Sequence, residues 1–265
     1  MRPRFHWELL VCGTSGHELI GTDAASLRPE DRLFARELDG LRWYRCVRCD
    51  SWLPLPLPDP PSVEVPPSRD EIELPLRGKA LRDKVVLRII AIDRAIHFVV
   101  LAALAVAVAL FASHRFRLRQ VFYRIVNAVQ GSSAGPSHTI HSGFLHELAY
   151  VVDLSSTTLY AVAAAAGAYA ILEGAEAVGL WYQRRWAEYL TFVATLVFLP
   201  YEIYELTRSV TVIKVGALVA NLAIAGYLLF AKRLFGLRGG GAAEEQARAF
   251  DVGWDALERT APRSP

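Results

Sequence analysis

Long apolar blocks separated by short polar segments dominate the chain after residue 84. An α-helix rises about 1.5 Å per residue, so about 20 residues cross the hydrocarbon core of a bilayer. Four of the blocks reach that length. The pattern therefore predicts an all-α membrane protein, a bundle of four transmembrane helices that span about 85–112, 156–181, 187–206 and 209–231.

The segment between the first two spans is too polar to cross a membrane. It contains two amphipathic pieces, roughly 116–129 and 143–154, which we expect to be loop helices along the membrane surface or against the end of the bundle. In the third span Pro200 is expected to kink the helix, because proline removes a backbone hydrogen bond.

The remaining sequence predicts a modular organisation around the four-helix transmembrane domain, residues 79–235. Residues 1–53 mix polar and aromatic side chains and are expected to form a small domain. Residues 54–78 hold eight of the fourteen prolines of the chain. That density prevents a helix and favours a stiff, extended linker.

The predicted C-terminal tail, residues 236–265, is flexible and contains one short amphipathic helix. Phe250, Trp254 and Leu257 recur at the helical spacing i, i+4 and i+7, so they would form one apolar stripe. The stripe indicates a helix that docks on the rest of the protein or on lipid. A helix that binds a protein partner is the alternative.

Composition and charge change this picture little. The 265 residues are 53% hydrophobic with a mean hydropathy of +0.25, and membrane lipid is the partner that such spans imply. The net charge of +2 is too small to indicate a nucleic-acid partner. The basic group of the N-terminal domain, Arg42, Arg45 and Arg48, indicates such a partner only weakly.

All three cysteines lie before the first span, and with one histidine they form a metal-ligand pattern. Cys12 and His17 are spaced C-x4-H, and Cys46 and Cys49 are spaced C-x2-C, so each pair could hold one side of an ion. Four protein ligands leave no open position for catalysis, and zinc would supply the folding free energy that about fifty residues lack. We therefore predict a zinc-ribbon-like domain with structural zinc. His6 is the alternative to His17, and an accidental C-x2-C in a loop is the alternative to a metal site.

Positive charge flanks the spans more heavily on the side of the two termini, with nine lysines and arginines against five. Cytoplasmic loops carry the excess of such residues. We therefore expect a multi-pass protein of the inner cell membrane with both termini in the cytoplasm, where cysteines stay reduced. No secretory signal peptide is expected, because the N-terminus has no apolar run of the required length.

Ionisable side chains occur inside the predicted spans, where a charge that faces lipid is costly. The helix directions put five of them at one depth near the inner side: Asp93, Arg94, His97, Glu173 and Glu176. Four polar groups lie toward the outer side: Glu202, Glu205, Lys214 and Asn221. We expect each span to turn its polar face inward, so that these groups meet one another.

Two roles for these charges stay open. Ion pairs could lock the bundle, with Arg94 against Glu173 or Glu176 and Lys214 against Glu202 or Glu205. The inner group, however, has three acids against one arginine and one histidine. That acidic surplus could hold a proton, pass a cation or coordinate a metal.

Several short motifs of the last three spans look familiar as a set. They include Leu172-Glu173-Gly174, Arg185-Trp186-Ala187-Glu188-Tyr189, Glu202-Ile203-Tyr204-Glu205 and Asn221-Leu222-Ala223-Ile224, with "LRIIAI" in the first span. Over about residues 82–234 the chain resembles a prokaryotic family of predicted integral membrane proteins, domain of unknown function family 2127. The resemblance implies four spans and carries no activity, substrate or catalytic residue. The N-terminal domain lies outside the part that resembles the family.

These features favour a non-enzymatic protein, a membrane anchor or adaptor whose cytoplasmic zinc-binding domain makes protein contacts. Contacts through the C-terminal helix, or between copies in a homo-oligomer, would serve the same role. The alternative is a small proton- or cation-coupled transporter that uses the intramembrane acids and His97. A membrane metalloenzyme is the third hypothesis, although the sequence has no nucleophile elbow, phosphate loop or dinucleotide fingerprint.

Overall fold

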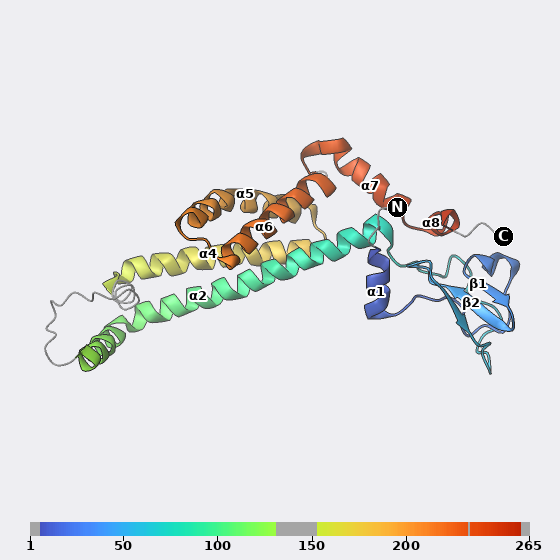
Figure 1. Cartoon of the computed structure of the whole chain (residues 1–265), viewed down its shortest axis with the longest axis horizontal. Helices are drawn as coiled ribbons and strands as arrows, with labels where there is room; N and C mark the ends of the chain where they lie inside the picture. The colour runs from blue at the N-terminus through green and yellow to red at the C-terminus, as the bar shows by residue number, and fades with distance from the viewer. Residues whose placement is uncertain (1–5, 131–152, 233, 261–265) are drawn as a thin grey trace. The chain divides into compact units, whose positions relative to one another are not determined.

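The structure, a computed structural model, describes residues 6–130, 153–232 and 234–260 (Figure 1). The chain packs as two units, one of Met1–Leu87 with Phe192–Pro265 and the other of Arg88–Thr191. This division cuts through the transmembrane domain expected at residues 79–235. The sequence-based boundaries at 53, 78 and 235 stay a prediction.

A three-stranded antiparallel sheet lies in the N-terminal part of the first unit. Its strands β1 (Ala35–Leu38), β2 (Leu41–Arg45) and β3 (Trp52–Leu55) are neighbours in chain order. The pair Asp39 and Gly40 joins β1 to β2 with positive φ angles of 54° and 74°. An Asp-Gly pair with these angles matches the right-handed twist of two strands in a tight hairpin.

Helix α1 (Trp7–Ser15) and a 3-10 turn, η1 (Pro29–Leu33), precede the sheet. The core of the sheet, against which Leu33 of η1 packs, contains six buried residues: Ile20, Phe34, Ala35, Tyr44, Val47 and Leu257. Leu257 comes from α8 (Trp254–Arg259), more than two hundred residues after β2. The N-terminal core is therefore completed by the C-terminal part of the chain.

Helix α8 is fixed to the sheet by polar contacts as well. Arg45, at the end of β2, donates from Nη1 to the Leu257 carbonyl at 3.0 Å and from Nη2 to Thr260 Oγ1 at 2.7 Å. The expected apolar stripe on one helix is wrong, because α7 (Gly240–Phe250) ends before α8 begins and Gly253 between them has a φ of 90°. Trp254 and Leu257 pack on the sheet, whereas Phe250 is 63% exposed.

The proline-rich segment is bonded to the loop before η1 and packs on the N-terminal core, whereas the sequence predicted an extended linker there. Backbone N–H groups of Ala25 and Ser26 donate to the carbonyls of Val63 and Glu64, each at 2.9 Å. Further along, Ile72 and Leu74 pack against the core. Proline lacks a backbone donor, but an extended chain keeps its carbonyls available as acceptors, and here the neighbouring loop uses them.

Within the described residues, four helices are long and apolar enough to cross a membrane, as the sequence predicted. They are α2 (Gly78–Gln130), α4 (Ser156–Trp181), α5 (Arg185–Arg208) and α6 (Val212–Gly226), the last prolonged by the π-helical turn η2 (Tyr227–Ala231); the 3-10 turn η3 (Leu234–Gly239) then leads to α7. Helix α5 continues through Pro200. The first amphipathic piece belongs to α2, and the second, about 143–154, lies almost wholly outside the described residues.

The start of α2 is held within the first unit by two carboxylates. Glu8 accepts from the backbone N–H of Gly78 and Asp251 accepts from that of Lys79, each at 2.8 Å. Negative groups are favourable there, because a helix N-terminus leaves N–H groups unpaired and carries a partial positive charge. A Cβ on Gly78, whose φ is 58°, would meet the Asp251 side chain at 2.4 Å. Only glycine fits this junction.

Replacing Leu257 with alanine should destabilise the N-terminal sheet and its core, called the N-terminal unit from here on. The expected loss is about 2–5 kcal/mol, the usual cost of a cavity left by a buried leucine. The measurement is the unfolding of the N-terminal unit in the detergent-solubilised full-length protein, monitored by limited proteolysis of the sheet region. Phe250→Ala is the matched control and should change little, since the Phe250 side chain is largely exposed and lies outside the core. Equal resistance of both variants to proteolysis would contradict this role for α8.

Candidate functional site

The three cysteines and one histidine come together from two short turns. The first turn follows α1: Cys12 lies in its last turn, and Gly16, with a φ of 84°, ends the helix and directs the chain to His17. The second turn connects β2 to β3 and carries Cys46 and Cys49. It is closed by the backbone hydrogen bond from Cys46 to Ser51, at 2.8 Å.

The four donor atoms form one compact set. All of them lie within 4.8 Å of one another. Cys12 Sγ is 3.7 Å from Cys46 Sγ, far longer than a disulfide bond, and Cys49 Sγ is 3.4 Å from His17 Nδ1. His6, the alternative ligand, precedes α1 and is not part of the set. This cluster of three cysteines and one histidine could bind a metal ion.

The thiols of this set differ in acidity. Burial raises the pKa of Cys12 to about 12, and hydrogen bonds with the other two cysteines add to the rise. Burial also raises the pKa of Cys46, but hydrogen bonds from the backbone of Cys49 and Arg48 outweigh it, and that pKa falls to about 7. Cys46 thus most readily supplies the thiolate, the form of cysteine that ligates a metal.

Arg48 ties the two turns together, a role that the sequence did not reveal. It is buried, and its Nη1 donates to Ser15 Oγ at 3.1 Å and to the Gly16 carbonyl at 3.3 Å, while Nη2 forms an ion pair with Glu18. The available signal was its position inside the C-x2-C motif. Arg42 and Arg45 are likewise buried and paired within the unit, with Glu37 and Asp50. The three arginines considered for nucleic acid therefore serve the interior.

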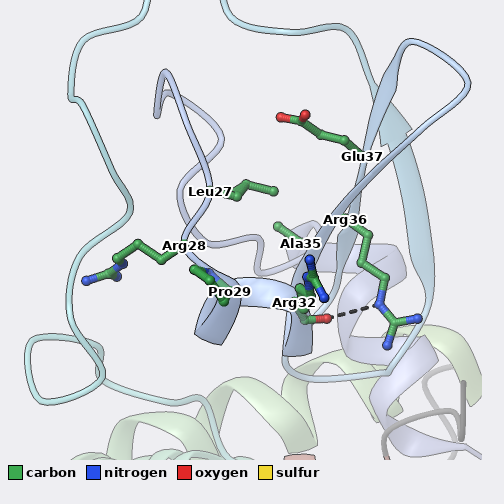
Figure 2. Close-up of a pocket in the computed structure, with 7 residues that line it drawn as sticks. All are labelled: Leu27, Arg28, Pro29, Arg32, Ala35, Arg36 and Glu37. Atoms are coloured by element: carbon green, nitrogen blue, oxygen red, sulfur yellow. Dashed lines mark hydrogen bonds between the residues drawn. The ribbon is translucent and has the colours of Figure 1, made fainter.

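A hollow of about 630 Å³ lies elsewhere on the N-terminal unit, between η1 and β1 (Figure 2). Arg28, Arg32 and Arg36 line it, together with Leu27, Pro29, Ala35 and Glu37. Arg28 is neutralised by Asp31, whereas Arg36 packs over the Trp52 ring and donates from Nε to the Arg32 carbonyl at 3.0 Å. Among the described residues, no carboxylate pairs with Arg32 or Arg36. The hollow thus presents two cationic groups.

Three of the five expected inner charges meet inside the second unit. Arg94 of α2 donates from Nη1 to Glu173 Oε1 of α4 at 3.1 Å, and its Nε lies 3.6 Å from Glu176 Oε2. All three side chains are buried. Gly174 allows this close approach, because a Cβ there would come within 3.1 Å of the Phe98 ring on α2.

Asp93 and His97 do not join that group, contrary to the expected single layer. They pair with each other at 3.6 Å, and their side chains are 45% and 55% exposed. The reason is helical geometry, because Asp93 precedes Arg94 by one residue and therefore points about 100° away around the helix.

The outer polar groups pair in the first unit. Lys214 of α6 donates to Glu205 Oε2 at 2.9 Å and to Ser209 Oγ at 2.6 Å. Asn221 donates from Nδ2 to Glu202 Oε1, so the lysine has one glutamate and the asparagine has the other. Glu202 and Glu205 thus join α6 to α5, and Ser209 joins α6 to the turn after α5.

A further group of charges, which the sequence did not indicate, is buried around Asp83. Asp83 on α2 pairs with Lys79 one turn earlier and accepts from the Tyr227 hydroxyl at 2.9 Å. Lys232 lies 3.9 Å from Asp83 Oδ2 and 2.5 Å from Glu244 Oε1 on α7. Two lysines thus face two acids, and the more exposed Arg82 also lies 4.0 Å from Asp83 Oδ1. The group joins α2, the end of the fourth span and α7 within the first unit.

The apolar helices and their inward charges define a membrane protein that carries a cluster of metal-ligand residues outside its spans. The chain belongs to the family described as "Predicted membrane protein (DUF2127)", whose model matches residues 86–232. No solved structure matches the chain significantly.

Uncharacterized proteins of Mycobacterium tuberculosis (Rv0090) and Mycobacterium bovis (Mb0093) are similar along nearly the whole chain. Each is 34% identical over 251 residues, which are 95% of this chain and 91% of the relative. That coverage leaves too few unmatched residues to omit the N-terminal sheet. The similarity therefore extends beyond the family match into the segment with Cys46 and Cys49.

Proposed function

We propose that the protein is a membrane anchor or adaptor whose N-terminal unit is folded around structural zinc and makes protein contacts. The observation that carries the zinc is the spacing of the donor atoms. Zn–S bonds of about 2.3 Å in a tetrahedral site separate two sulfurs by roughly 3.8 Å and a sulfur from a nitrogen by roughly 3.5 Å. The distances Cys12–Cys46, 3.7 Å, and Cys49–His17, 3.4 Å, fit that site.

A structural role suits this ligand set. Cys12, His17, Cys46 and Cys49 would fill all four positions, so no position remains for a substrate or an activated water. The two turns that carry them have few apolar residues of their own, and a metal that joins them contributes folding free energy directly. This argues for a binding protein rather than an enzyme.

Purified full-length protein should contain about one zinc per chain, measured by mass spectrometry of the metal. Cys46→Ser should lose it, because the ligand that most readily ionises is gone. Ser51→Ala keeps all four ligands and is the matched control. Zinc retained in Cys46→Ser, or absent from the wild type, would remove the metal from the proposal.

The proposed location is the inner cell membrane with both termini in the cytoplasm. The excess of lysine and arginine on that side of the spans supports it. The shared core of β2 and α8 supports a common side for both terminal segments, as an even number of spans requires.

A membrane-impermeant thiol reagent should fail to label chelator-treated intact cells and should label Cys49, which is partly exposed, in inverted vesicles treated in the same way. Ser209→Cys places a thiol between α5 and α6, on the opposite side in this topology, and is the positive control for intact cells. The reverse pattern of labelling would place the termini outside.

The arginine-lined hollow is the contact surface that we assign to the adaptor role. Arg32 is exposed and Arg36 is held in place over Trp52, so both are positioned for an acidic group of a partner protein. Arginine recognises carboxylates well, because its planar guanidinium presents parallel donors.

A photo-crosslinking residue at position 32 should give a discrete crosslinked product in cells, and Arg36→Glu should abolish it by charge repulsion. The same residue at position 245 on α7, exposed and outside the hollow, is the control and should not give that product. Identical products from both positions, or a product that survives Arg36→Glu, would argue against this surface.

Proton-coupled transport is the second candidate function, and one observation favours it. The inner group of charges has two buried glutamates against one arginine. This surplus of buried acid does not depend on the adaptor role.

A further inference from the structure

Glu176 is a buried carboxylate without a hydrogen-bonding partner of its own. Its side chain on α4 is completely buried, and neither oxygen has a hydrogen-bond partner among the described residues. The guanidinium of Arg94 donates hydrogen bonds to Glu173, one turn before Glu176 on the same helix, and its Nε lies 3.6 Å from Glu176 Oε2.

The charges around Glu176 do not balance if both glutamates are ionised. The charged groups that act on it are Arg94 of α2 and Glu173 of α4, and α5 contributes the neutral hydroxyl of Thr191. Asp93 and His97 pair with each other on the exposed side of α2. Two ionised glutamates against one arginine would leave one uncompensated negative charge in a buried site, which proteins avoid at a cost of several kcal/mol.

Glu176 also lies too deep to reach the membrane surface. Trp181 ends α4, and Arg88 packs over its ring at 4.8 Å, an arrangement typical of the membrane–water interface. Glu176 precedes Trp181 by five residues, which is about 7 Å deeper along the helix axis. A glutamate side chain with no exposed surface cannot relieve its charge by extending to water.

A bound proton or a bound metal cation could neutralise the surplus. A sodium or potassium ion needs several oxygen ligands at once. The fixed positive charge of Arg94 at 3.6 Å would also repel it. A proton needs no further ligand and removes the charge at its source.

We propose that Glu176 is a proton-binding site within the membrane, held as a neutral carboxylic acid beside the ionised pair of Arg94 and Glu173. The neutral acid has a donor to offer, and the buried Thr191 hydroxyl of α5, which interacts with Glu176, can accept it. Two glutamates one turn apart on α4 thus have different charges, because Arg94 donates hydrogen bonds to Glu173 and lies farther, at 3.6 Å, from Glu176.

The direct test is infrared spectroscopy of the full-length protein in lipid at neutral pH. The wild type should show the carbonyl band of a protonated carboxylic acid, shifted in heavy water, and Glu176→Gln should lack it. A band of equal intensity in Glu176→Gln, or a band that disappears on exchange of potassium for sodium in the buffer, would overturn the proposal. The second outcome would mean that a metal cation displaces the proton.

Thermal unfolding of two matched variants shows which glutamate carries the proton. Glu176→Gln exchanges one neutral group for another of the same shape, so its melting temperature should stay close to that of the wild type. Glu173→Gln removes the carboxylate that hydrogen-bonds to Arg94, and Glu176 can replace it only from a longer distance, so the melting temperature should fall by several degrees. The opposite order would place the proton on Glu173 and contradict the proposal.

An apolar carbodiimide gives a readout that needs no variant, because it reacts with protonated carboxyl groups. Peptide mapping of the treated wild type should find the adduct on Glu176 and not on Glu173. In Glu173→Gln the adduct should be lost, since Glu176 then becomes the ionised partner of Arg94. An adduct on Glu173, or on neither residue, would count against the assignment.

Discussion

A charge that leaves water needs an opposite charge or a proton within a few ångströms, and this requirement shapes every part of the chain that the structure describes. In the N-terminal unit, Arg42, Arg45 and Arg48 are buried and each meets a carboxylate. At the start of α2, two lysines face two acids around Asp83. In the membrane, Arg94 meets Glu173. Beside that pair, Glu176 adds a second buried carboxylate, and the proposed proton balances its charge.

The same requirement explains how a small polar unit can be joined to a long apolar helix. Helix α2 begins at Gly78, where carboxylates of α1 and of the residues after α7 accept its first N–H groups. One turn later the buried group around Asp83 begins. The junction is therefore held by charge and hydrogen bonds as well as by the buried apolar residues Ala80 and Leu81, which suits a position where the chain passes from water toward lipid.

The sequence predicted what depends on local patterns. Four apolar blocks gave the four helices because a span needs only length and hydropathy. The spacing of Cys12, His17, Cys46 and Cys49 selected the residues that the structure brings together, because close ligand pairs lie on tight turns. The missed features all join distant residues: Leu257 with the sheet, Arg48 with the first turn, and Lys232 and Glu244 with Asp83. Asp93 and Arg94 were assigned one layer by depth alone, although one residue along a helix changes the face.

The closure of the N-terminal core by α8 has a consequence for how the protein is made. Synthesis proceeds from the N-terminus, and the sheet is complete in the nascent chain long before Leu257 is added. All four membrane helices must leave the ribosome and be inserted in the interval. During that time Phe34, Tyr44 and Val47 lack their contact with Leu257. A chain cut short after the fourth helix would display an open apolar core, the kind of surface that cellular proteases and chaperones recognise. The core of the N-terminal unit is therefore completed only after the whole polypeptide has been translated and its helices have been inserted.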